Sequence, residues 1–155
     1  MSDETLRIYA DTSVFGGVFD EEFASPSRKF FEQVWEEQYR LVCSLLVQKE
    51  IEGAPEKVRK FFDAMSLVSE WITPTSEARE LQNAYLRKGI VSSRFADDAL
   101  HVAVATVHQC NLIISWNFRH IVHFDKIEMY NEVNAQCGHG KIEIYSPWEV
   151  IAYED

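Results

Sequence analysis

Five short apolar runs alternate with segments of helical periodicity along the chain, and this alternation restricts the fold more than any other feature. The runs cover residues 6–10, 41–44, 67–69, 112–115 and 142–145. Runs of this length, bounded by turn residues or helical patterns, are typical of strands. Strands separated by helices predict an α/β fold with a parallel sheet covered by helices on both faces.

The segments between the runs carry recognisable helix starts and ends. Helices are expected to begin at Ser25-Pro26, to cover 45–51, to begin at Pro55, to run from 73–77 to Lys88-Gly89, to cover 97–108 and 124–133, and to begin at Pro147. The pair Gly16-Gly17 is expected to permit the turn after the first strand. It is too short to be a phosphate-binding loop.

Length and composition predict one domain covering residues 1–155. Hydrophobic residues make up 46% of the chain, yet no apolar run reaches the roughly 18 residues of a membrane span. Residues 1–5 are polar and acidic, unlike a secretory signal. Cys43 and Cys110 lie in apolar surroundings, which is typical of reduced core cysteines. We therefore expect a cytoplasmic protein with no membrane partner.

The chain is acidic, with 15 basic and 25 acidic residues and a formal net charge of −10. This balance opposes non-specific binding to nucleic acids, which depends on Lys and Arg displacing counterions. It leaves room for a local basic patch, for a cation-filled pocket that neutralises several acids, and for a basic partner protein.

Four polar residues lie at or behind the ends of apolar segments: Asp11, Glu50, Asp98 and Asn117. In parallel α/β sheets, ligands bind at the carboxyl ends of the strands. Carboxylates that meet there repel one another, and a divalent cation relieves this repulsion. Mg²⁺ prefers such hard oxygen ligands. The four residues therefore predict a metal-binding pocket, provided that the fold brings them together.

Each of these residues also has a structural explanation. Asp11 is suited to cap a turn or helix through its Asp-Thr-Ser stretch. One of Asp97 and Asp98 is expected to be a helix cap, and we assign Asp98 as the free acid. Glu50 would otherwise be a solvated helix residue, and Asn117 an ordinary turn residue. The metal-binding pocket is supported by the occurrence of all four residues at such positions and not by any one of them alone.

Other candidate sites are weaker. His120 and His123 have no cysteine or acid to complete a zinc site, and His101 is expected to be a hydrogen-bonded core residue. If the ligand is a nucleic acid, Lys49 and Arg94 are its expected contacts among the basic residues, because each lies near a proposed ligand along the chain. Trp116 borders the proposed pocket and is a candidate for stacking on a base.

Four segments of the chain resemble the signature segments of PIN domains, and in particular the small VapC-type toxins. They are residues 9–14, 44–51, 98–103 and 113–117, with the sequences YADTSV, SLLVQKEI, DALHVA and IISWN. The likeness extends over nearly the whole chain in the same order. The first and third segments are fairly specific, and the second and fourth are loose.

This resemblance implies a Rossmann-like sheet, Mg²⁺- or Mn²⁺-dependent cleavage of RNA, homodimers and an antitoxin partner. Asp11, Glu50 and Asp98 would be the acidic metal ligands, and Thr12 or Ser13 would orient Asp11. Asn117 stands where many members have an acid, and Phe118-Arg119-His120 follows where a further acid is common. Arg119 would then neutralise a phosphate.

The sequence thus predicts a metal-dependent endoribonuclease, the toxin of a toxin–antitoxin pair, with Asp11, Glu50, Asp98 and Asn117 at its active site. Two alternatives remain open. One is a PIN-like binding module without nuclease activity, which Asn117 and the net charge favour. The other is an unrelated Rossmann-like phosphatase.

Overall fold

The computed structural model describes residues 5–151 and contains one five-stranded, all-parallel sheet. The strands are β1 (Arg7–Ala10), β2 (Arg40–Ser44), β3 (Glu70–Ile72), β4 (Leu112–Ile114) and β5 (Glu143–Tyr145), in the order β3-β2-β1-β4-β5. In the central strand, Ile8 is in register with Leu41 on one side and Leu112 on the other. The predicted α/β class is confirmed. The acidic residues 1–4 lie outside the described residues.

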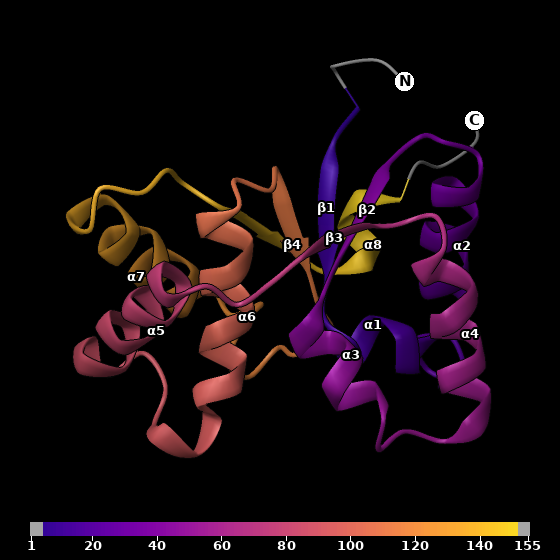
Figure 1. The fold of residues 1–155 in the computed structure, drawn as a ribbon, viewed down its shortest axis with the longest axis horizontal. Coiled ribbons are helices and arrows are strands. Elements are labelled where there is room, and N and C mark those ends of the chain that lie inside the picture. The colour runs from indigo at the N-terminus through magenta and orange to yellow at the C-terminus, as the bar shows by residue number, and fades with distance from the viewer. Residues whose placement is uncertain (1–4, 152–155) are drawn as a thin grey trace.

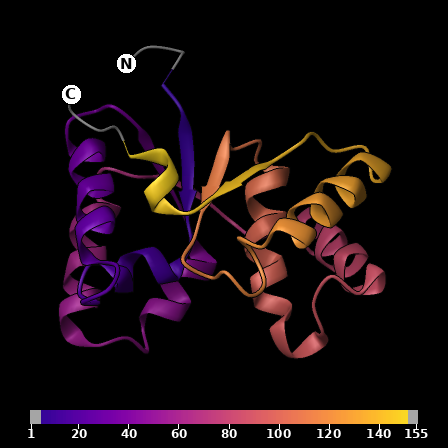
Figure 2. The ribbon, with the colours of Figure 1, turned by 180° about the vertical axis from the view of Figure 1, so that it is seen from behind.

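Two groups of helices enclose the sheet (Figure 1), and the same arrangement is visible from behind (Figure 2). The first group comprises α1 (Thr12–Gly17), α2 (Ala24–Trp35), α3 (Leu45–Ile51), α4 (Glu56–Ser66) and α8 (Pro147–Val150). The second group comprises α5 (Ser76–Lys88), α6 (Ala96–Val107) and α7 (Phe124–Gln136), with the 3₁₀ turn η1 (Ser93–Phe95) leading into α6. The strands end between the two groups, at the lower side of Figure 1.

The core consists of the apolar strands and the helix faces that cover them. In β1, Ile8, Tyr9 and Ala10 are completely buried, as expected for a strand with a neighbour on each edge and helices on both faces. Phe15 of α1 packs between Phe31 of α2 and Phe62 of α4, with ring centroids 5.0 and 5.1 Å away. This aromatic contact fixes α1 against the sheet directly behind the end of β1.

Two local predictions are wrong. The apolar residues 67–69 do not form a strand, because α4 continues to Ser66 and the chain then turns, leaving the Leu67 side chain 86% exposed. The third strand follows as β3. The Gly16-Gly17 pair lies within α1 instead of forming a turn, since Asp11 begins this helix as its N-cap.

The remaining helices agree closely with their predicted starts. Thr75 caps α5 by accepting a hydrogen bond from Ala78 N, and Gly89 ends that helix in the left-handed conformation at φ 80°. Cys43 and Cys110 are buried free cysteines, as predicted. No helix in the described part of the chain is both long and apolar enough to cross a membrane.

Candidate active site

A pocket of about 490 Å³ lies at the carboxyl ends of β1, β2 and β4. It is lined by Asp11, Thr12, Ser13, Glu50, Asp98, His101 and Asn117. Asp11 directly follows β1, Glu50 lies on α3 behind β2, Asp98 is in the first turn of α6, and Asn117 follows β4. The four residues expected to converge therefore line one pocket, because the strands that carry three of them are neighbours in the sheet.

Asp11 is almost completely buried, with 4% of its surface exposed. Its Oδ1 accepts hydrogen bonds from Ser13 N (3.1 Å) and Ser13 Oγ (2.6 Å), and its Oδ2 accepts one from Ser115 Oγ (2.7 Å). Burial raises the pKa of Asp11, while the charge of His101 and the two serine hydrogen bonds only partly offset this effect. The ionised carboxylate is therefore held rigidly in a place where a further positive charge would stabilise it.

Glu50 ends a chain of hydrogen bonds that reaches into the core. His101 Nε2 lies 2.7 Å from Glu50 Oε1, and His101 Nδ1 lies 2.7 Å from the Tyr9 hydroxyl, which is 2.8 Å from Ser44 Oγ. Thr12 Oγ1 also donates to Glu50 Oε1. With Glu50 ionised, Nε2 must carry a proton, because a carboxylate only accepts. These bonds direct the Glu50 side chain into the pocket.

The Glu50–His101 pair shifts the pKa values of both groups. Burial alone would raise the pKa of Glu50, but the hydrogen bond and charge of His101, with the Thr12 hydrogen bond, lower it below 4.5. Burial likewise opposes protonation of His101, yet the Glu50 hydrogen bond and the charges of Asp11, Glu50 and Asp98 raise its pKa above 6.5. Each partner thus favours the charged form of the other.

This pair predicts a pH-dependent stability. The contribution of Glu50 is present above its ordinary pKa of 4.5 and lost as the pH falls through its lowered pKa. The contribution of His101 is present below its ordinary pKa of 6.5 and lost as the pH rises through its raised pKa. Both contributions are present between pH 4.5 and pH 6.5, the ordinary pKa values of the two groups. In this range we expect His101→Gln to reduce the free energy of unfolding by about 1.5–3 kcal/mol, and by less at lower or higher pH. Urea denaturation of the metal-free proteins measures this difference, and a pH-independent difference would contradict the pairing.

Asp98 and Asn117 are fixed by the turn that follows β4. Asp98 Oδ2 lies 2.9 Å from His120 Nδ1. Asn117 Oδ1 accepts hydrogen bonds from Arg119 N (3.2 Å) and His120 N (2.9 Å), so its side chain caps this turn. Asn117 therefore orders the loop that holds His120 against Asp98.

The donor set fits a hard divalent cation in its chemistry. Three carboxylates line the pocket, and no lysine or arginine of residues 5–151 lines it with them. The arrangement itself is not a closed ligand set, since no group of three or more His, Cys, Asp or Glu side chains in this range is placed to hold a metal ion. Glu50 and Asp98 are each hydrogen-bonded to a histidine instead.

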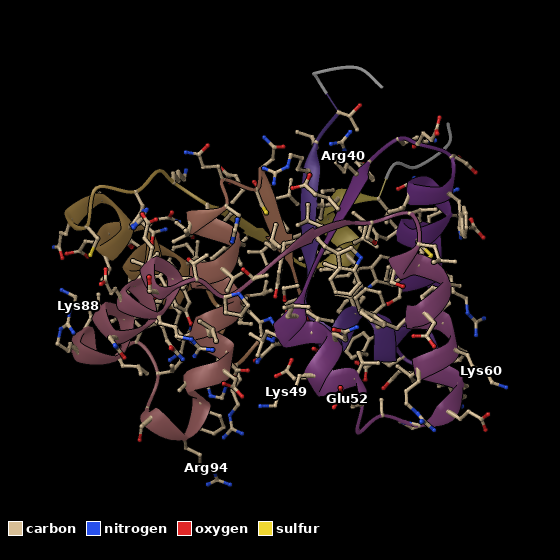
Figure 3. All side chains as sticks on the ribbon, viewed as in Figure 1. Arg40, Lys49, Glu52, Lys60, Lys88 and Arg94 are labelled. Carbon is tan, nitrogen blue, oxygen red and sulfur yellow. The ribbon has the colours of Figure 1, made fainter. Side chains whose placement is uncertain are left out.

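The remaining residues that were predicted to contact the substrate or to orient Asp11 lie at different places, not all of them in the pocket. Ser13 orients Asp11, whereas Thr12 contacts Glu50. Lys49 borders a neighbouring groove. Arg94 lies in η1 with its guanidinium 5.6 Å from the Phe95 ring centre, and Figure 3 shows its side chain at the lower tip of the molecule. Arg119 is exposed on the turn behind Asn117.

Trp116 is not available for base stacking, so that prediction is wrong. Its side chain is 6% exposed, its ring stacks on Phe23 at 4.2 Å, and its Nε1 donates to Ser27 Oγ at 2.8 Å. Trp116 instead anchors the end of β4 to α2, and its backbone N donates to Ser13 Oγ.

Sequence reasoning did not assign His101 and His120 to the site. For His101 a signal existed, because it lies three residues after Asp98 and therefore shares a helix face with it. For His120 the sequence offers no such periodicity, since it lies in a turn and its contact with Asp98 spans 22 residues.

Neither a family model nor a curated protein sequence matches the chain. Solved structures match it in fold. One is the structure of VapBC2 from Rickettsia felis bound to a DNA fragment from their promoter, with a TM-score of 0.61, 12% identity, and 91% of this chain and 98% of that chain covered. The structure of FitAB bound to an IR36 DNA fragment gives a TM-score of 0.62, 10% identity and coverage of 95% and 99%.

A toxin–antitoxin complex from Klebsiella pneumoniae matches with a TM-score of 0.54 and 19% identity, covering 73% of this chain and 88% of that chain. At these identities the likeness concerns the fold alone, and in each case it extends over most of both chains. The order of the five parallel strands and the pocket at their carboxyl ends agree with the resemblance found in the sequence. The chain therefore has a PIN-like α/β fold.

Proposed function

We propose that this protein is a Mg²⁺- or Mn²⁺-dependent endoribonuclease and the toxin of a toxin–antitoxin pair. One observation carries the proposal: Asp11, Glu50 and Asp98, from three separate segments, line a single pocket at the carboxyl end of the sheet. The fold supports it, because the matching solved structures include a toxin–antitoxin complex. A surface salt bridge or helix cap would not require three such acids to meet.

In this proposal Asp11, Glu50 and Asp98 hold the cation, which when bound would lower the pKa of a water molecule and stabilise charge on a phosphate. The serine hydrogen bonds keep Asp11 in one orientation, and His101 and Thr12 do the same for Glu50. His120 and the Asn117-capped turn fix Asp98. Glu50 and Asp98 are both candidates for accepting the proton of the attacking water.

The proposed partners are an RNA substrate, an antitoxin protein and a second copy of the chain in a homodimer, with the cytoplasm as the place of action. The net charge of −10 supports a basic protein partner better than extended contact with RNA. RNA contact would then be confined to a small part of the surface.

The test is cleavage of single-stranded RNA by the purified protein. We expect cleavage with Mn²⁺ and its loss, by more than about 100-fold, when EDTA removes the metal, because the carboxylates alone supply no positive charge to the phosphate. Internal cleavage products, seen on a denaturing gel, distinguish an endonuclease. Cleavage that persists in EDTA, or release of inorganic phosphate from a small phosphomonoester, would contradict the proposal.

A second function is a PIN-like binding module without nuclease activity. It is favoured by the histidine bonds to Glu50 and Asp98 and by the engagement of the Asn117 oxygen in its own turn. Calorimetric titration with Mn²⁺ separates the two functions, since a module would not bind millimolar metal.

A further inference from the structure

A second groove adjoins the carboxylate pocket and shares Glu50 with it. Its volume is about 620 Å³, within the range of about 300–1,000 Å³ of small-ligand sites. Its walls are formed by α3, the segment after β3, α5 and the first two turns of α6. The groove therefore continues the proposed site in the direction of β3, away from Asn117.

Two cationic side chains, Lys49 and Arg79, line this groove. Both residues are exposed, and neither side chain has a hydrogen-bond or ion-pair partner among residues 5–151. Figure 3 shows Lys49 at the lower side of α3, below the ends of the strands. In a chain with a net charge of −10, two unpaired cations beside a pocket of carboxylates are a marked local contrast. Glu50, shared with the carboxylate pocket, and Asp97 are the opposing charges in the same groove.

The groove also has an apolar part. Leu45, the first residue of α3, is a large apolar side chain that is 47% exposed. Pro74, in the segment before α5, also lines the groove. Leu46 and Leu100 form a buried floor between them. Cations beside an apolar wall suit a single-stranded nucleic acid, since each nucleotide offers one phosphate and one flat base that packs against apolar side chains.

We propose that this groove is a subsite for the nucleotide next to the cleaved phosphate of a single-stranded RNA. Lys49 and Arg79 neutralise its phosphate, and its base lies against Leu45 and Pro74. This inference rests on the proposed nuclease function, because it takes the carboxylate pocket as the place of cleavage. Base pairing would bury the faces and edges of the base in a duplex, so the groove selects unpaired RNA.

The test measures binding of a short, fluorescently labelled single-stranded RNA in the Asp11→Asn background, where cleavage does not interfere. We expect Lys49→Gln and Arg79→Gln each to weaken binding about fivefold, and the salt dependence, as the slope of log K against log salt, to decrease by about 0.7 for each cation removed. We expect Asp97→Asn, which removes one of the two opposing charges, to strengthen binding. Lys60→Gln is the matched control, since Lys60 lies on α4 away from the groove (Figure 3) and pairs with Glu56.

The double variant Lys49→Gln/Arg79→Gln gives the decisive comparison. Both positions are exposed, so we expect their replacement to leave the thermal unfolding temperature unchanged. If the parent cleaves RNA with Mn²⁺ but the double variant binds RNA with unchanged affinity and salt slope, the subsite is wrong and the nuclease function stands. If the parent itself neither binds nor cleaves RNA with Mn²⁺, the proposed function fails. Loss of binding to polyglutamate with RNA affinity unchanged would assign the groove to an acidic peptide and overturn the subsite.

Discussion

Replacing Asp11 by Asn is expected to reduce Mn²⁺-dependent RNA cleavage by more than about 100-fold and to stabilise the metal-free protein near neutral pH. The first effect follows because Asp11 would be a direct metal ligand, and even residues that only support a ligand typically contribute about 10–100-fold. The second follows because Asp11 is buried and its pKa is raised. Its ionised form therefore costs free energy once the pH exceeds that pKa, and a neutral amide avoids this cost.

Initial rates of cleavage and urea denaturation without metal measure the two effects of Asp11→Asn. Glu52→Gln is the matched control: Glu52 follows α3, is exposed and does not line the pocket, so its replacement should change neither quantity. An Asp11→Asn protein that cleaves RNA at the parent rate would remove Asp11 from the catalytic site. A variant that loses both activity and stability would indicate a structural role instead.

The second large effect concerns the two neighbouring glycines of α1. We expect Gly17→Ala to lower the free energy of unfolding by about 1–3 kcal/mol, as overpacking of a buried position does. A methyl group at Gly17 would lie 2.7 Å from Ser27 Oγ and 2.7 Å from Trp116 Nε1, the two atoms that share a hydrogen bond of 2.8 Å. The substitution therefore forces α1 away from the anchor of β4.

Gly16→Ala is the control for this prediction, because the same change one residue earlier has no atom within 4 Å to meet. There alanine should stabilise the protein by about 0.5–1 kcal/mol through its higher helix propensity. Denaturant titration of the two variants decides the matter. Equal effects of both substitutions would mean that the close contact between α1 and Trp116 does not exist in solution.

The convergence of the acids could be predicted from sequence because it depends on topology. A strand that ends at Asp11, a helix that carries Glu50 directly behind the next strand, and parallel pairing suffice to bring both to one edge of the sheet. Asp98 lies at the same edge because α6 leads back to the start of β4. The first turn of α6, which carries Asp98, is therefore at the carboxyl ends of the strands. None of these steps requires knowledge of side-chain packing.

The partners of the acids could not be predicted in this way. The contact between Glu50 and His101 spans 51 residues and depends on how closely α3 and α6 approach. Helix α1 was not predicted from the sequence either, because its two glycines weaken helix propensity and the helix is only six residues long. A glycine is needed at position 17 because the Trp116 side chain lies too close for a Cβ atom, and this contact becomes evident only in three dimensions.

The convergence of Asp11, Glu50 and Asp98 on one divalent cation is the central claim, and anomalous diffraction from a crystal soaked in MnCl₂ tests it most directly. We predict manganese density in the pocket at the carboxyl ends of β1, β2 and β4, within ligand distance of oxygens from all three carboxylates. A pocket without manganese at a saturating concentration, or manganese bound only elsewhere on the protein, would contradict it.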